Sequence, residues 1–485
     1  MTDRPATADP GSAQAAAIPA RLEPDAIGVA QDTIIGLANV GPALSVALTL
    51  AGLAAAAAYG AVPVILLCMV PMVIIANAYR RLNLWSANAG ASFEWVGRAI
   101  NPYLAFVTGW LMLAANVLGT TAATVILAPS ILAVFGSNST STWPNILIST
   151  AVIAVMLVIA IVGIRPTARV QVGIAAVEYT ILIGFAIAGL IAVLNHHPGT
   201  FPITKGWFSL TGINGQGDLA SGLLLGVFLF AGWDATVYVN EEVKHRRQNP
   251  GKAAVYAVFG LAIIYVISQI GLQGVVSPAK LQANSDSVLV YVADALGGPG
   301  WAKVMAFALA ISVAASVGIG IVALSRISYG MAARRVLPPI LGRVNHRYST
   351  PVIASLVMGV LLVAIIWVYL LSTSVANVFS QLISVVGLLY AAFYVLTAAA
   401  VITYYRRRIV SNAWEMLLSG ILPLCAAGFL VWITVKTLQT MTSPERWSLI
   451  GIAAAGVLVM LIVRFTLQPE FFQTPRESAA KGRPS

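Results

Sequence analysis

The chain has 485 residues, of which 59% are hydrophobic and only 9% are charged, and its formal net charge is +11. A soluble globular protein carries about 25% charged residues. This composition therefore excludes a soluble globular protein and indicates a polytopic membrane protein. The excess of Lys and Arg need not indicate nucleic-acid binding, because the basic residues of membrane proteins collect in their cytoplasmic loops.

Between two polar tails, residues 1–24 and 467–485, the sequence predicts an all-α polytopic membrane protein. Its apolar runs are long enough to cross a bilayer as helices. The amino-terminal tail mixes Ala, Pro and acidic residues without a periodic face, which favours a disordered tail over a signal peptide. The twelve predicted transmembrane helices are roughly 28–55, 60–78, 102–129, 144–163, 170–194, 219–240, 252–275, 301–323, 351–372, 376–404, 413–435 and 447–466.

Lys and Arg are distributed unevenly between the predicted loops. If the amino end is cytoplasmic, the inside loops hold seventeen of these residues and the outside loops hold five. Because basic loops stay on the cytoplasmic side, both termini are predicted to be cytoplasmic. We therefore expect an integral protein of the plasma (inner) membrane.

Two predicted helices are interrupted at matching places. The first is broken by the Gly-Pro pair at 41–42, since proline removes a backbone donor and biases the preceding residue away from helical geometry. The sixth is broken at Ala231, Gly232, Trp233 and Asp234. Such breaks point to a transporter site near the middle of the membrane, where the freed N–H and C=O groups can bind a carboxylate and an ammonium. The alternative is that both residues merely kink packed helices.

Four separated stretches carry a common pattern. They are "AYRRLNLWSANAGASFEWVGRAINPYLAFVTGW" (78–110), "GIRPTARVQVGIAAVE" (163–178), "FAGWDATVYVNEEVKHRRQNPGKA" (230–253) and "SRISYGMAARRVLPPILGRVNHRYSTPVIA" (325–354). In this order and spacing they resemble amino acid permeases of the amino acid–polyamine–organocation (APC) superfamily.

The resemblance implies a LeuT-like fold and alternating access around the two breaks. The first inverted five-helix repeat would occupy residues 25–195 and the second residues 219–404. Two peripheral helices would follow in residues 413–466.

The resemblance also assigns roles near the breaks. Phe228, four positions before Gly232, corresponds to an aromatic gate over the substrate. Many members hold the substrate carboxylate with the amides of a Gly-Ser-Gly-like turn in the first helix. Here "ANVGPA" (38–43) takes that place, and the amides of Val40, Gly41 and Ala43 could still serve. This departure keeps an amine or polyamine substrate open as an alternative.

Two acidic residues, Glu178 and Asp234, lie deep in predicted spans. Ionisable groups there are costly and suggest function, and burial favours the protonated form of a carboxyl, so either residue could couple transport to a proton gradient. The resemblance places Glu178 where several members carry a lysine that stands in for a sodium ion. Glu178 could instead bind a cation with Ser312 or Ser316, or merely hydrogen-bond a neighbouring helix. Asp234 could also bind an ammonium group or cap a helix.

Further polar residues lie on the third and sixth predicted helices. Asn116, Thr120 and Thr121 form a patch at helical spacing that either faces the cavity or joins two helices. Glu241 and Glu242, near a cluster of basic residues, are expected to form exposed salt bridges at a gate or in a loop. The expected substrate-binding residues are Asn39, Val40, Gly41, Ala43, Asn116, Thr120, Phe228, Ala231, Gly232, Trp233 and Asp234, with Glu178 and Asp234 expected to couple the proton.

Other functional classes lack their sequence signals. The chain shows no channel filter, no HExxH or GxSxG motif and no Walker A motif, so neither an enzyme nor an ATP-driven pump is predicted, and no cofactor or metal. The sequence therefore predicts a secondary active importer of amino acids, driven by proton symport. An amine or polyamine permease, or an exchanger of the same fold, is the alternative. The expected partners are the substrate, the coupling proton and membrane lipid, and no nucleic acid.

Overall fold

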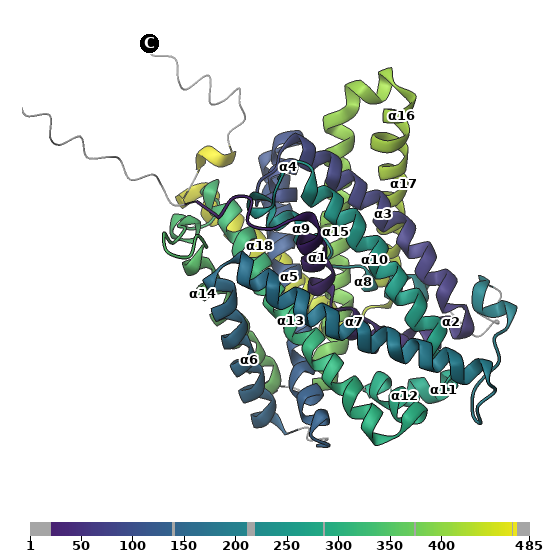
Figure 1. The fold of residues 1–485 in the computed structure, drawn as a ribbon. Helices are drawn as coiled ribbons and strands as arrows, with labels where there is room; N and C mark the ends of the chain where they lie inside the picture. The colour runs from purple at the N-terminus through teal and green to yellow at the C-terminus, as the bar shows by residue number, and fades with distance from the viewer. Residues whose placement is uncertain are drawn as a thin grey trace, which may run out of the picture.

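The computed structural model describes residues 21–137, 141–210, 219–284, 287–372, 375–467 and 469–472. Most of the two predicted tails, 1–24 and 467–485, lies outside these residues. The described chain is helical, apart from one isolated parallel bridge between Ile27 and Val243. The prediction of an all-α protein is confirmed (Figure 1).

The α-helices follow one another closely along the chain. Their bounds are α1 Val29–Val40, α2 Pro42–Ala57, α3 Ala61–Trp85, α4 Ala91–Ala99, α5 Pro102–Val134, α6 Thr142–Val162, α7 Ile164–Leu194, α8 Leu219–Leu229, α9 Ala235–Tyr238, α10 Asn249–Leu272, α11 Pro278–Ala283, α12 Val288–Gly297, α13 Pro299–Ala333, α14 Val352–Ser372, α15 Val375–Ser411, α16 Ala413–Glu415, α17 Leu422–Thr440 and α18 Ser443–Ile462. The expected repeat 25–195 would contain α1–α7, and the expected repeat 219–404 would contain α8–α14 and most of α15. The boundaries of both repeats stay predictions.

Within the described residues, eleven helices are long and apolar enough to cross a membrane. The protein is therefore an integral membrane protein. The sixth predicted span, 219–240, is divided between α8 and the short α9, so neither piece reaches that length. The count of twelve spans stays a prediction.

Burial separates central from peripheral helices. In the spans Val29–Thr49 and Pro299–Ala333, 78% and 83% of the most apolar stretch is buried, against 28% for Ala413–Thr440 and 11% for Ser443–Phe465. Around α1 pack α7, α10 and α13, while α6 and α14 lie side by side along one flank (Figure 1). The helix that carries the first break is thus at the centre of the bundle, and the last two helices lie at its edge.

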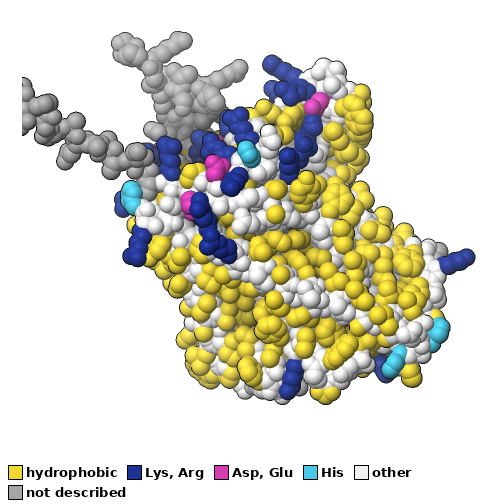
Figure 2. All heavy atoms as spheres, viewed as in Figure 1, with side chains coloured by type: hydrophobic (Ala, Val, Ile, Leu, Met, Phe, Trp, Pro, Cys, Tyr) yellow, Lys and Arg dark blue, Asp and Glu magenta, His cyan; other side chains and the backbone are white. Residues whose placement is uncertain are grey.

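Charged side chains gather at one end of the molecule, around α4 and α16, and an apolar surface covers most of the view below them (Figure 2). This uneven distribution agrees with the loop asymmetry in the sequence. Basic residues at this end include Arg98, on α4, and Arg81, which pairs with Glu415 of α16. We refer to it below as the basic end.

Two glycines let α7 and α10 approach closely. A β-carbon at Gly189 would lie 2.0 Å from the carbonyl oxygen of Gly271. A β-carbon at Gly271 would lie 2.1 Å from the carbonyl oxygen of Ala186. Contact between backbones through small residues is the usual way in which membrane helices pack tightly.

We expect the substitution Gly189→Ala to lower the free energy of unfolding by about 1–3 kcal/mol, because the added methyl group must push two backbones apart. Thermal unfolding of the purified protein in detergent measures this effect. The matched control is Gly184→Ala on the same helix, where a β-carbon meets nothing within 4 Å. Alanine favours a helix over glycine, so the control should be neutral or slightly stabilising. Equal melting temperatures for the two variants would contradict the expected close contact.

Candidate functional site

The first helix is broken at Gly41. This residue adopts a left-handed conformation with φ +65°, and its amide donates to the carbonyl of Leu37 at 3.1 Å, which ends α1. Glycine adopts this conformation without the steric cost of a β-carbon. Proline is well suited to a first helical position, and α2 begins at Pro42. The Gly-Pro pair therefore produces the predicted break.

The second break follows α8. Gly232 has φ +111°, and the helix resumes at Ala235, whose amide donates to the carbonyl of Gly232 at 3.2 Å. The hydroxyl of Tyr265 donates to the carbonyl of Leu229 at 2.7 Å, which satisfies a buried acceptor at the end of α8. The prediction of an interruption at 231–234 is confirmed.

Direct contacts join the two breaks. The side-chain amide of Asn39 donates from Nδ2 to the carbonyl of Gly232 at 2.9 Å. The hydroxyl of Ser316, on α13, donates to the carbonyl of Asn39 at 2.8 Å. One turn earlier in α1, a β-carbon at Gly36 would lie 2.7 Å from Cγ2 of Thr236. The end of α1, the turn after α8 and the middle of α13 are thus packed together.

Glu178 caps the beginning of α2. Its Oε1 accepts the amide of Ala43 at 2.9 Å and the hydroxyl of Ser312 at 2.7 Å. The oxygen of Ser312 in turn accepts the amide of Leu44 at 3.3 Å. The side chain of Glu178 is buried and connects α7 with the first break and with α13.

These hydrogen bonds occupy backbone amides at the first break, between α1 and α2. From the sequence, the amides of Val40, Gly41 and Ala43 could still serve as donors to a substrate carboxylate. Instead, the amide of Gly41 is bonded to Leu37, and that of Ala43 is bonded to Glu178. The beginning of α2 keeps its positive dipole character, but its first amides already have acceptors within the protein.

A cavity of about 60 Å³ lies between the two breaks and the helices α5, α13 and α15. Six of the predicted substrate-binding residues line it, namely Asn39, Val40, Asn116, Thr120, Phe228 and Ala231. Gly41, Ala43, Gly232, Trp233 and Asp234 do not line it, and neither does Glu178. The predicted residues therefore fall into a cavity wall and a supporting layer behind it.

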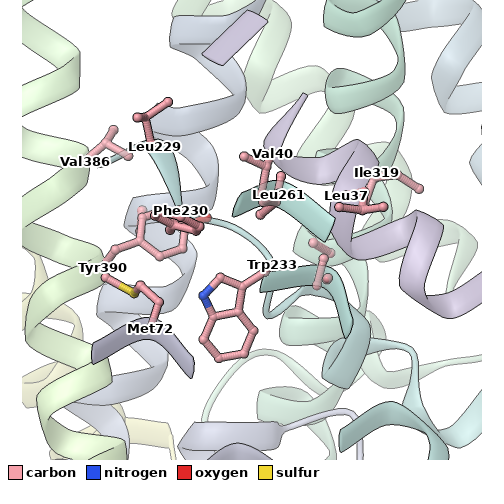
Figure 3. Close-up of a cluster of buried hydrophobic side chains, with 14 of the residues drawn as sticks. Leu37, Val40, Met72, Leu229, Phe230, Trp233, Leu261, Ile319, Val386 and Tyr390 are labelled. Carbon is pink, nitrogen blue, oxygen red and sulfur yellow. The ribbon is translucent and has the colours of Figure 1, made fainter. Parts of the chain in front are cut away.

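The carboxylate of Asp234 is turned into an aromatic cluster. The hydroxyls of Tyr238 and Tyr394 both donate to it, the latter at 3.0 Å. The ring of Trp233 stacks on Tyr394 at 5.4 Å between centroids and meets Tyr79 edge-on at 5.0 Å. Figure 3 shows Trp233 in a buried cluster with Met72, Phe230 and Tyr390. Asp234 thus ties the second break to α15.

Tyr390 belongs to both the cavity and the aromatic cluster. It lines the cavity, and its ring lies 5.7 Å from that of Tyr394. Sequence reasoning missed it, because nothing in the apolar run of α15 marks one tyrosine as a wall residue. The other missed wall residues are Leu44, Ser45, Leu48, Gly119, Ala122, Ala123 and Val386. Only Ser45 carried a usable signal, a hydroxyl one turn after the break.

A buried ion pair lies at the basic end. Arg326 donates from Nε and Nη2 to the two carboxylate oxygens of Glu242 at 3.1 and 3.0 Å, and both side chains are fully buried. The carbonyl of Glu242 also accepts the amides of Ala26 and Ile27. The predicted exposed salt bridge of Glu242 is therefore wrong: its partner is distant in sequence and the pair is excluded from solvent.

Glu241 has a different environment from its neighbour. One of its carboxylate oxygens accepts the amide of Ala89 at 3.0 Å. Burial raises the pKa of the Glu241 carboxyl, although that hydrogen bond and the charge of Arg246 act in the opposite direction. Together with Glu242, it joins the chain after α9 to the turn before α4 and to α13.

Asp32, on the first broken helix, is a further buried acid. Its side chain is fully buried in the first turns of α1, and neither carboxylate oxygen has a hydrogen-bond partner in the described part of the chain. Buried polar groups without a partner are rare in folded proteins. Asp32 therefore joins Glu178 and Asp234 as a candidate for proton binding.

A helical membrane protein with two broken helices bonded to each other beside a small, partly polar cavity has the architecture of a secondary transporter. The model of the amino acid permease family matches residues 33–470, so the chain belongs to the amino acid permease family.

Three relatives illustrate the family. The vacuolar cationic amino acid transporter 4 of Arabidopsis thaliana is 23% identical over 343 residues, which are 67% of this chain and 53% of that protein. The D-serine/D-alanine/glycine transporter of Escherichia coli (strain CFT073) is 21% identical, over 64% of this chain and 65% of its own. The methylthioribose transporter of Bacillus subtilis is 23% identical, over 62% of this chain and 65% of that protein. Each match spans less than two thirds of the relative.

The fold also resembles a solved structure. The crystal structure of MhsT in complex with L-phenylalanine superposes with a TM-score of 0.59 at 16% identity, covering 86% of this chain and 99% of that one. This similarity shows the shared fold and confirms the LeuT-like architecture that the sequence resemblance implied.

Proposed function

We propose that this protein is a secondary active transporter that imports amino acids across the plasma membrane by alternating access. The observation that carries the proposal is the small cavity between two broken helices that are bonded to each other through Asn39 and Gly232. Membership of the amino acid permease family supports it. We also propose that the basic end and both termini face the cytoplasm, because the basic residues of membrane proteins collect on that side.

We propose that transport is coupled to protons through the buried acids. An ionised Glu178 makes charge-assisted hydrogen bonds to Ala43 and Ser312, which are stronger than bonds to a neutral carboxyl. Protonation would weaken the cap on α2 and loosen its attachment to α7 and α13. Asp234 would act in the same way on its bonds to Tyr238 and Tyr394. Proton binding would thus be linked to movement of both broken helices.

An amine or polyamine carrier is the second candidate. It is favoured by the helix 1 turn, where the amides of Gly41 and Ala43 are already bonded within the protein. A substrate without a carboxylate would not need these amides.

Uptake into proteoliposomes separates the candidates. Radiolabelled L-amino acids, spermidine and putrescine are supplied with and without an inward proton gradient. We expect amino acids to accumulate and the gradient to increase the accumulation severalfold. Protein-free liposomes and a proton ionophore are the controls. Uptake of the amines alone would contradict the amino acid proposal and support the amine carrier. Uptake that does not depend on the gradient would contradict proton coupling.

A further inference from the structure

The cavity wall is polar but carries no charge. The polar side chains on it are Asn39, Ser45, Asn116, Thr120, Ser316 and Tyr390. Among the described residues that line the cavity, none is acidic or basic. The remaining wall is aliphatic or aromatic, and includes Leu48, Phe228 and Val386.

The acidic side chains of Asp234 and Glu178 are already hydrogen-bonded within the protein. Both oxygens of Asp234 are bonded to tyrosines in the aromatic cluster, and Glu178 is bonded to Ala43 and Ser312. Neither acid lines the cavity. A charged side chain of a substrate would therefore lose its water without finding an ion partner, and an unpaired buried charge is strongly unfavourable.

The α-ammonium and α-carboxylate of a substrate have other partners. The carboxyl ends of α1 and α8 reach the cavity at Val40 and Ala231 and carry partial negative charge, which suits an ammonium group. The amino end of α2 reaches it at Leu44 and keeps partial positive dipole character, but the amides of Ala43 and Leu44 are bonded within the protein, so a carboxylate would take its hydrogen bonds from the polar side chains of the wall. The wall thus matches a zwitterion whose side chain is uncharged.

The size of the cavity narrows the choice further. A volume of about 60 Å³ accommodates about four to six water molecules, since each needs about 10–15 Å³ on this measure. Glycine, alanine and serine are of this size, whereas arginine and phenylalanine are much larger. Ala122, Ala123 and Gly119 line the wall, and Val386 lies against Gly119.

We propose, resting on the proposed function, that the substrates are small neutral amino acids of the size of glycine, alanine and serine, and that cationic amino acids are excluded. This differs from what the name of the Arabidopsis relative says of that protein. The proposed basis is the uncharged wall, with Gly119 and Val386 limiting the length of the substrate side chain.

Competition for uptake tests the proposal. Unlabelled glycine, alanine, serine, phenylalanine, arginine and glutamate each compete with radiolabelled alanine in proteoliposomes. We expect the three small amino acids to compete, and the other three to require at least about tenfold higher concentrations. If no amino acid is taken up by folded protein, the proposed function itself fails. If arginine or phenylalanine is taken up as well as alanine, only the substrate class fails.

Two substitutions test the wall in opposite directions. Gly119→Ala should be well tolerated, because its β-carbon would meet only Cγ1 of Val386 at an ordinary 3.7 Å. It should reduce the uptake of serine relative to glycine by about tenfold, the usual effect of one methyl group in a pocket. Val386→Ala should admit larger neutral residues such as leucine.

The matched control is Val360→Ala, at a valine that is 66% exposed on α14 and away from the cavity. It should leave the selectivity unchanged. If Gly119→Ala has the same ratio of glycine uptake to serine uptake as the control, Gly119 does not limit the length of the substrate side chain. The proposed role of the wall is then overturned.

Discussion

Replacing Glu178 with glutamine is expected to abolish accumulation of substrate against its gradient, while exchange of substrate across the membrane continues. The glutamine side chain has nearly the same shape, and its carbonyl oxygen can still accept from Ala43 and Ser312. The cap on α2 therefore survives, but the side chain can no longer bind and release a proton. Gradient-driven accumulation should fall by at least about tenfold, toward simple equilibration.

The comparison is made in the same proteoliposomes, with accumulation and counterflow measured side by side. Glu415→Gln is the control, since this acid pairs with Arg81 at 2.5 Å, outside the cavity and its supporting layer. It should keep full accumulation. If Glu178→Gln also does, proton coupling does not pass through Glu178, and Asp234→Asn and Asp32→Asn become the next variants.

Replacing Gly232 with leucine is expected to remove substrate binding. The backbone there has φ +111°, a conformation that L side chains rarely adopt, and a β-carbon would lie 3.0 Å from Nδ2 of Asn39. The side chain would strain the turn and displace the amide that bonds the two breaks together. Affinity for the transported amino acid should fall by about a hundredfold or more, as measured by equilibrium binding to the purified protein.

The matched control is Gly428→Leu, on α17, where a β-carbon meets nothing within 4 Å. Its binding should equal that of the parent protein. Melting temperatures of both variants show whether the fold is retained. A folded Gly232→Leu variant that binds normally would show that the unwound turn is not part of the substrate site.

Local chemistry made the breaks predictable. Proline at 42 and glycine at 41 and 232 act on their own backbone, so the sequence alone placed both interruptions correctly. The prediction that the polar patch of α5 faces the cavity was also correct in part, since both Asn116 and Thr120 line the cavity. Periodicity indicated one face of a helix, but only packing decided that this face meets the cavity.

Contacts between distant segments were not predictable in the same way. Glu242 and Arg326 are 84 positions apart, and the nearer basic residues made a local salt bridge the simpler hypothesis. The direction of the Asp234 carboxylate depends on Tyr394, from another helix. The difference between twelve and eleven spans has the same origin, because unwinding at Gly232 leaves α8 and α9 too short to count.

Two of the ion pairs near the basic end differ in their access to salt. Arg334, paired with Glu94, is 52% exposed, whereas Glu242 and Arg326 are completely covered. Mobile ions screen charges at the surface over a Debye length of about 8–10 Å, but they hardly reach a pair enclosed by protein. Ionic strength should therefore alter the outer pair and leave the inner one almost untouched. The link that Glu242 and Arg326 make between the chain after α9 and α13 should therefore hold at low and at high salt alike.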